Sequence, residues 1–254
     1  CLISFPSNSE PAAEAVALET RPTLDGDVLN DRAWKTTNIN QFWQQRPVEG
    51  SPASQKTEVF IGYTDRALYI GVVCYDTKPE GIIVSDSRRD ADLEDTDSFT
   101  ILIDSYLDQQ NGFVFGTNPA GIEYDGQVTK EGSGAFGSGG GGFNLNWDTN
   151  WQVKTQTGDF GWSAEFEIPF KSLRYSSQTA QTWGFNFQRN IRRNNEVAFW
   201  SPIDRQYDLF RIADAGRVTS IETPAQRNLK ITPTPRQQFW RKDGADFLCR
   251  YLVR

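Results

Sequence analysis

Short runs in which apolar and polar residues alternate dominate this sequence, and turn-forming residues separate them. The alternation is clearest at residues 57–63, 97–104, 161–168 and 183–191, whereas residues 67–75 are almost continuously apolar. A period of two places successive side chains on opposite faces of a strand, and a continuous apolar run is typical of a strand buried on both faces. Helix-period patterns are almost absent, apart from one turn near Pro169. The pattern therefore predicts an all-β fold, and many short strands favour an antiparallel β-sandwich.

Changes in composition divide the chain into three parts. Residues 1–20 are rich in Ser, Pro, Ala and Glu and predict a flexible arm or linker. Residues 21–222 carry the strand pattern. Residues 223–254 are polar and contain several prolines, which predicts an irregular tail. The Gly-rich residues 132–142 predict a flexible loop, because the Gly-Lys-Ser/Thr of a phosphate-binding loop does not follow them.

The composition excludes several kinds of chemistry. The chain has 0 His and 0 Met, which rules out Ser-His-Asp and Cys-His catalysis, His-based zinc sites and haem held by His or Met. A net charge of −7 argues against a nucleic-acid partner or an anionic membrane surface.

Three cysteines bear on the cellular compartment. Cys1 suits the lipid-modified first residue of a bacterial lipoprotein, although it also fits the end of a signal-peptide apolar region. Cys74 lies within an apolar run and is expected to be a small core residue. A disulfide between Cys74 and Cys249 stays open at this point, because pairing cannot be deduced from spacing.

Five ordered motifs resemble one family. They are Leu24-Asp25-Gly26-Asp27 followed by Ala33-Trp34, the hairpin at 59–75 ending in Asp76, the run at 97–104, the run at 161–165 leading into 168–173, and the run at 183–187. Together they resemble the superfamily of family 9 carbohydrate-binding modules, which implies a β-sandwich. The segments 186–196 and 115–121 look like the subgroup that precedes an outer-membrane barrel. Only 36 residues follow Val218 in this sequence, fewer than a barrel needs, so we do not carry the barrel function over.

The resemblance also implies where a sugar would bind. The family's module clamps a sugar between two Trp residues, and this chain has Glu94-Asp95-Thr96 at one of those positions and Tyr207 at the other. Sugar-binding sandwiches place flat aromatic faces against pyranose rings. Further aromatic candidates are Trp200, expected to anchor the core or rim, and three residues in or near loops: Trp43, Trp147 and Trp151.

An acidic loop suggests a metal. Asp90, Asp92, Asp95 and Asp97 offer hard oxygen ligands of the kind that Ca²⁺ prefers, and relatives in the family often hold structural calcium. The alternative is a solvated loop whose carboxylates pair with Arg88 and Arg89. Another basic group consists of Arg189, Arg192 and Arg193. We expect these side chains either to pair with the acidic loop across the rim of the sandwich or to bind an anion.

These observations support three functional hypotheses. The leading one is a non-catalytic module that binds polysaccharide or an envelope glycan, outside the cytoplasm or in the bacterial cell envelope. The second is an interaction domain that docks on a partner protein or self-assembles. The third is a glycan-cleaving enzyme based on Glu165 and Glu167, which share one strand face; alternation places that face opposite Trp162, where we expect it to be in solvent.

Overall fold

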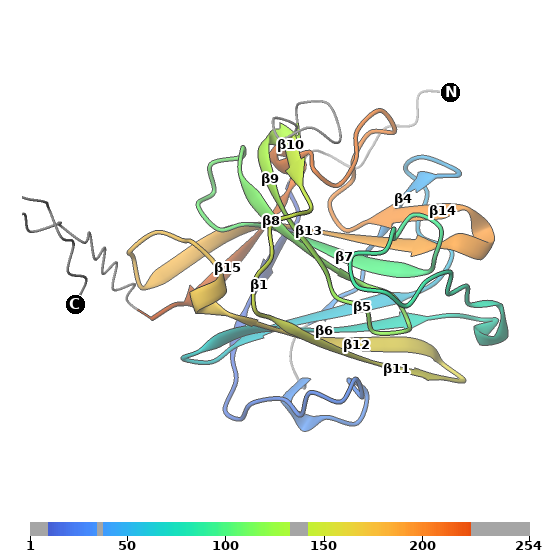
Figure 1. The fold of residues 1–254 in the computed structure, drawn as a ribbon, viewed down its shortest axis with the longest axis horizontal. Helices are drawn as coiled ribbons and strands as arrows, with labels where there is room; N and C mark the ends of the chain where they lie inside the picture. Colours follow the sequence, from blue (N-terminus) through green and yellow to red (C-terminus); the bar gives the residue numbers. More distant parts are fainter. Residues whose placement is uncertain (1–9, 35–37, 133–141, 225–254) are drawn as a thin grey trace, which may run out of the picture. The chain divides into compact units, whose positions relative to one another are not determined.

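The computed structural model describes residues 10–34, 38–132 and 142–224. Two β-sheets pack face to face over these residues, one in each layer of Figure 1. The sandwich predicted from the sequence is therefore confirmed. Cys1, Cys249, residues 133–141 of the Gly-rich segment and the tail beyond residue 224 lie outside the described residues.

The larger sheet contains nine strands. Their order across the sheet is β1 (Ala12–Glu14), β15 (Gly216–Glu222), β13 (Ala180–Ile191), β7 (Ser98–Asp104), β8 (Gly112–Thr117), β9 (Tyr124–Gly132) and β10 (Gly142–Asn144). Strand β14 (Glu196–Phe199) pairs with the second half of β13, and β4 (Trp43–Arg46) pairs with β14.

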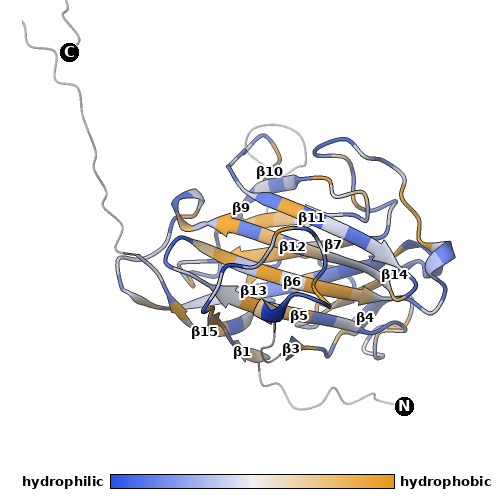
Figure 2. Cartoon of the chain, turned by 90° about the horizontal axis from the view of Figure 1, so that it is seen from below, coloured by the Kyte–Doolittle hydropathy of each residue, from blue (hydrophilic) through white to orange (hydrophobic). Residues whose placement is uncertain are grey.

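The smaller sheet contains six strands. Their order is β11 (Gln152–Gly158), β12 (Gly161–Pro169), β6 (Ala67–Tyr75), β5 (Thr57–Tyr63) and β2 (Val16–Ala17), with β3 (Asn38–Ile39) also paired to β5. Five single-turn 3-10 helices connect strands in the described chain: Arg32–Trp34, Pro79–Gly81, Phe170–Ser172, Arg192–Asn194 and Ile212–Asp214. The third of these is the turn expected near Pro169. In Figure 2, β6 is apolar along most of its length, whereas the edge strand β11 is mostly polar.

The N-terminal residues correct two expectations. The sequence predicts a flexible arm over residues 1–20, but β1 pairs with β15 in one sheet and β2 pairs with β5 in the other. Both pairings are parallel, so the two sheets are mixed and not purely antiparallel. These strands are very short and mostly exposed, so the sequence shows no alternation of apolar and polar residues there.

The core between the sheets is strongly aromatic. The ring of Phe99 stacks on Phe187 at 5.8 Å, and Trp151 stacks on Phe166 at 5.9 Å with an interplanar angle of 5°. Aromatic pairs in this geometry add to the stability that comes from burial alone. Cys74 also lies in this core as a free, buried thiol.

A loop covers the outer face of the smaller sheet. The indole of Trp34 lies on Gly71 of β6, where a Cβ atom would come within 2.9 Å of the ring. Val28 and Val73 complete this apolar contact. Strand β6 is therefore buried on both faces, as its continuous apolar run predicts. Within the described residues, no helix is long and apolar enough to cross a membrane.

Candidate functional site

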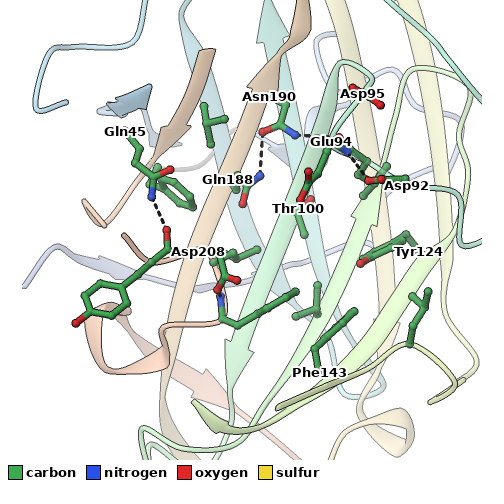
Figure 3. A pocket seen from close by; sticks show the side chains of 18 of the residues that line it. Gln45, Asp92, Glu94, Asp95, Thr100, Tyr124, Phe143, Gln188, Asn190 and Asp208 are labelled. Atoms are coloured by element: carbon green, nitrogen blue, oxygen red, sulfur yellow. Dashed lines mark hydrogen bonds between the residues drawn. The ribbon is translucent and has the colours of Figure 1, made fainter. Parts of the chain in front are cut away.

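A groove of about 1250 Å³ lies on the outer face of the larger sheet. Two loops form its walls: one contains residues 90–95 and the other residues 205–210. Figure 3 shows the floor between them, with Gln45, Gln188, Thr100 and Tyr124 following one another across the site.

Strand alternation supplies the floor. In β7, Phe99 and Ile101 point into the core, so Thr100 between them faces the groove. In β13, Phe187 is likewise in the core and Gln188 lines the groove. Hydroxyl and amide groups on such a floor are suited to hydrogen bonds with a polar ligand.

Hydrogen bonds fix the orientation of the floor amides. Gln188 Nε2 donates to Asn190 Oδ1 at 2.9 Å, and Asn190 Nδ2 donates to the Leu93 carbonyl at 2.9 Å. This chain joins β13 to the acidic loop. Because its Nε2 is bonded to Asn190, Gln188 can offer a ligand in the groove its side-chain carbonyl oxygen as an acceptor.

The loop after β14 holds Tyr207 at one end of the groove. Buried Gln45 donates its Nε2 to the Tyr207 carbonyl at 2.8 Å, and the Tyr207 amide donates to the Asp204 carbonyl at 2.9 Å. The guanidinium carbon of Arg211 lies 4.7 Å from the centre of the Tyr207 ring. Tyr207 is 40% exposed as a residue, so Arg211 supports the ring while part of the residue remains accessible to a ligand.

The opposite wall is the acidic loop. Asp92, Glu94 and Asp95 line the groove there. Asp95 pairs with Arg192 at 3.1 Å, and the Glu94 amide donates to Asp92 Oδ1 at 2.8 Å. Figure 3 shows these carboxylates across the floor from Asp208. They present hydrogen-bond acceptors, which suit the hydroxyl groups of a neutral ligand.

Three stacked rings close the far end. Phe143 stacks on Phe210 at 4.3 Å with an angle of 13°, and Tyr124 stacks on Phe143 at 6.1 Å with an angle of 18°. Gly126 leaves room for Phe143, since a Cβ there would come within 2.4 Å of the ring. The stack therefore joins β9 and β10 to the loop that also carries Tyr207.

The hydroxyl of Tyr124 stays protonated. Burial raises the pKa of Tyr124, and the nearby carboxylates of Asp92, Asp90 and Glu94 raise it further. This hydroxyl is therefore a neutral O–H donor beside the acidic wall.

The four predicted tryptophans do not line the groove. Within residues 10–34, 38–132 and 142–224, Tyr207 is the predicted aromatic residue that lines the groove. Trp151 and Trp200 are buried in the core, and Trp147 packs half-buried on Phe113 at 5.1 Å. Trp43 is half-buried at the edge strand β4, where it bridges to Pro52. Trp151 does lie in the loop directly before β11, as expected, but its ring is buried and stacked on Phe166, so it is not free to stack on a sugar.

Arg189 is a structural residue in this fold. It is 1% exposed, and its guanidinium donates to the carbonyls of Lys56 at 2.7 Å and Tyr75 at 2.6 Å and to Thr57 Oγ1 at 2.9 Å. These bonds tie β13 to the other sheet through the core. The expectation that it lines a ligand site or pairs with the acidic loop at the rim is therefore corrected, whereas Arg192 does pair with that loop.

The four predicted calcium ligands do not form a common site. Asp90 pairs with Arg89 at 3.5 Å, Asp95 pairs with Arg192, and Asp97 accepts the Ile83 amide at 2.8 Å. Asp92 accepts the Glu94 amide. In the part of the chain that the structure describes, no three acidic or cysteine side chains are grouped as metal ligands would be. The residues present therefore do not fit a calcium ion in this loop.

The two carboxylates of the enzyme hypothesis, Glu165 and Glu167, also have protein partners. Glu165 is fully buried, which corrects the expectation that it is in solvent. It accepts hydrogen bonds from Trp34 Nε1 at 2.7 Å and from the amides of Gly26 at 2.8 Å and Asp25 at 2.9 Å. Glu167 pairs with Arg21 at 2.6 Å. Both hold the loop over the outer face of the smaller sheet, on the other layer from the groove.

Sequence reasoning missed most of the groove. Gln45, Tyr124, Phe143 and Phe210 line it but belong to no motif, and Gln188 lies in the segment 186–196 without being predicted as a site residue. The alternation of β7 and β13 could have shown which side chains leave the core. No local signal indicates that β10 and the loop at 205–210 meet over the same face.

The fold has counterparts among solved structures. Two mixed sheets packed as a sandwich give the chain the fold of family 9-like carbohydrate-binding modules.

Solved structures carry this comparison. A family 9 carbohydrate-binding module from Caldicellulosiruptor kristjanssonii in complex with glucose is 14% identical, with a TM-score of 0.55, over 87% of this chain and 100% of the other. Its cellotriose complex gives a TM-score of 0.51 over 89% and 100%. A candidate carbohydrate-binding protein from Bacteroides uniformis, also 14% identical, gives a TM-score of 0.59 over 83% and 99%. No family model and no curated protein matches the sequence. At this identity the likeness establishes the fold alone.

Proposed function

We propose that this chain is a non-catalytic carbohydrate-binding domain that holds a neutral saccharide in the groove on its larger sheet. We place it outside the cytoplasm or in the bacterial cell envelope, where its polysaccharide partner would be found.

One observation carries the proposal. Family 9 carbohydrate-binding modules, which this sequence resembles, clamp a sugar at two positions. The corresponding residues here lie on facing walls of the same groove, Glu94-Asp95 on one wall and Tyr207 on the other. These positions are more than 100 residues apart in the sequence, so only folding brings them together. Tyr207 offers a supported ring for stacking, and the acidic wall offers acceptors for hydroxyl groups.

The groove is polar in a way that suits sugars. Its floor carries Thr100 and the oriented amides of Gln188 and Asn190, while aromatic rings also line it. A few placed polar groups among apolar surfaces are typical of small-molecule sites that recognise hydroxyl groups. A hydrolytic role based on Glu165 and Glu167 lacks this support, because both side chains bind the loop at residues 21–34.

Affinity gel electrophoresis tests the proposal. Soluble β-glucan, xylan and galactomannan would each be cast in native gels, and the mobility of the wild-type chain would be compared with that of Tyr207→Ala. Loss of one stacking ring should weaken retention about fivefold. The matched control is Tyr106→Ala, since Tyr106 is 53% exposed and does not line the groove.

The outcomes separate the rival functions. Retention that Tyr207→Ala weakens and Tyr106→Ala does not supports the groove as a saccharide site. A wild-type chain that migrates freely through all three polysaccharides would contradict the proposal and favour the interaction-domain hypothesis. The melting temperature of Tyr207→Ala should fall by only ~2 °C, because the substitution removes a surface cation–π contact and no core packing.

A further inference from the structure

We propose that Arg211 is a positioning residue that fixes the orientation of the Tyr207 ring, and that Glu131 at the end of β9 holds Arg211 in place. This inference rests on the proposed saccharide function and assigns to the same site the residues that control its stacking ring. Neither Arg211 nor Glu131 lines the groove, so their effect on a ligand would act through Tyr207.

The Tyr207 ring depends on Arg211 for its orientation. Two hydrogen bonds of Tyr207 fix its backbone: the amide donates to the Asp204 carbonyl at 2.9 Å, and the carbonyl accepts Nε2 of Gln45 at 2.8 Å. They leave the side-chain torsions free to rotate. The guanidinium carbon of Arg211 lies over the ring, 4.7 Å from its centre. A guanidinium at this distance is attracted to the ring face and therefore restricts the rotation of an exposed side chain.

Hydrogen bonds also fix the backbone around Arg211. Its amide donates to the Asp208 carbonyl at 3.1 Å, and its carbonyl accepts the Asp214 amide at 3.2 Å in the single-turn helix Ile212–Asp214. Arg211 therefore extends from a hydrogen-bonded turn, and the direction of its side chain depends on the groups that the guanidinium meets.

Two carboxylates meet that guanidinium. Nη1 of Arg211 donates to Glu131 Oε2 at 2.8 Å, and Nε lies 3.9 Å from Asp214 Oδ2. The side chains of Arg211 and Glu131 are only 33% and 27% exposed. Partial burial shields their pair from solvent, so it holds the guanidinium more firmly than a fully exposed pair would. Because Glu131 belongs to β9 and Tyr207 to the loop after β14, the pair connects the ring to a separate strand.

The backbone of β9 is unusual where it carries Glu131. Lys130, Glu131 and Gly132 all have positive φ angles, of 52°, 53° and 72°. Residues with a Cβ rarely adopt this left-handed conformation, and it persists only where surrounding contacts enforce it. The ion pair with Arg211 is one such contact, and packing on Phe210 is another, since a Cβ at Gly132 would lie 2.9 Å from that of Phe210. Strain of this kind concentrates at functional sites, and here it presents Glu131 to Arg211.

A double-variant cycle tests the role of Arg211. Retention in β-glucan, xylan and galactomannan gels would be compared for the wild type, Arg211→Gln, Tyr207→Ala and the variant with both changes. Arg211→Gln should weaken retention about threefold, because the ring is no longer held in one orientation. In the Tyr207→Ala background the same change should have no further effect, because no ring remains to be positioned. Arg217→Gln, which breaks an exposed pair with Glu10, is the matched control and should leave retention unchanged.

Fluorine NMR measures the ring directly and needs no ligand. In the chain labelled with 3-fluorotyrosine, Tyr207→Phe and Tyr106→Phe identify the two resonances to be compared. Arg211→Gln should shift the Tyr207 resonance and leave that of Tyr106 unchanged, because the charge beside one ring is lost. Arg211→Lys keeps a cation and should restore part of both the shift and the retention. Glu131→Gln should change both in the same direction as Arg211→Gln.

The outcomes separate this inference from the proposed function. An unchanged Tyr207 resonance in Arg211→Gln, undiminished retention of that variant, or a loss of retention that is the same with and without the Tyr207 ring would overturn the inference and leave the saccharide function in place. A wild-type chain that passes freely through all three polysaccharides would overturn the proposed function. The fluorine resonances would then still decide whether Arg211 fixes the ring.

Discussion

The indole nitrogen of Trp34 donates a 2.7 Å hydrogen bond to Glu165 Oε1, although 131 residues separate the two in the sequence. Glu165 Oε2 accepts the amides of Asp25 and Gly26. One buried carboxylate thus fastens the loop that carries the first motif of the chain to the outer face of β12. The Asp25-Gly26 turn, Trp34 and Glu165, which belong to separate motifs in the sequence, therefore form one hydrogen-bonded unit.

Replacing this carboxylate should destabilise the fold. Glu165→Gln puts an NH₂ group where an acceptor is needed, so one buried N–H loses its partner, and the free energy of unfolding should fall by about 2–3 kcal/mol. Urea denaturation measures the change. Glu167→Gln is the control on the same strand; its pair with the exposed Arg21 should contribute less than ~1 kcal/mol. Equal losses in the two variants would contradict the role assigned to Glu165.

Arg189 should be needed for stability and not for binding. Arg189→Lys keeps the charge but cannot reach the carbonyls of Lys56 and Tyr75 together, so we expect a loss of about 2 kcal/mol in urea denaturation. Polysaccharide retention should stay unchanged. Arg217→Lys, which alters a surface pair with Glu10, should have little effect on either measurement. If Arg189→Lys folds with native stability but is no longer retained by polysaccharide, Arg189 contributes to ligand binding and its structural role is contradicted.

Cys74 should be chemically inert in the folded chain. Burial raises the pKa of the Cys74 thiol to about 12, so at pH 8 almost no reactive thiolate is present. Iodoacetamide at pH 8, followed by peptide mapping, should label Cys74 only after denaturation. Rapid labelling of Cys74 in native protein would contradict its placement.

The same shift gives stability a pH dependence. The folded pKa is raised above the ordinary value of about 8.5, so the stabilisation is complete below that value and is lost as pH rises toward 12. Between these limits the free energy of unfolding should fall by up to ~1.4 kcal/mol per pH unit from this group. Cys74→Ala should lack this component of the slope in denaturation curves recorded from pH 8 to 10.5.

Calcium should not stabilise the acidic loop. Asp90, Asp95 and Asp97 each have a different protein partner, and within the described residues their carboxylates are not grouped around one point. We expect the melting temperature to be the same in EGTA and in millimolar Ca²⁺. A ligand of the folded state would raise it by mass action, so a drop in EGTA that Ca²⁺ reverses would show that the loop rearranges around a metal.

The sequence by itself determined the strands and their faces. The alternation in residues 97–104 and 183–191 assigned Phe99, Ile101 and Phe187 to the core, because a period of two is a local property of an extended backbone. The continuous apolar run of β6 likewise indicated burial on both faces.

Tertiary structure decided everything that depends on segments distant in the chain. Alternation placed Glu165 opposite the core, but the loop at residues 24–34 buries that opposite face, and no local pattern encodes which loop covers it. The groove is a second case. Tyr207 and the acidic loop face one another because β14, β13 and β7 are neighbours in one sheet, and the loop that follows β14 and the loop that precedes β7 lie over the same face. Hydrophobic periodicity fixes which way a side chain points, whereas long-range packing fixes what it meets.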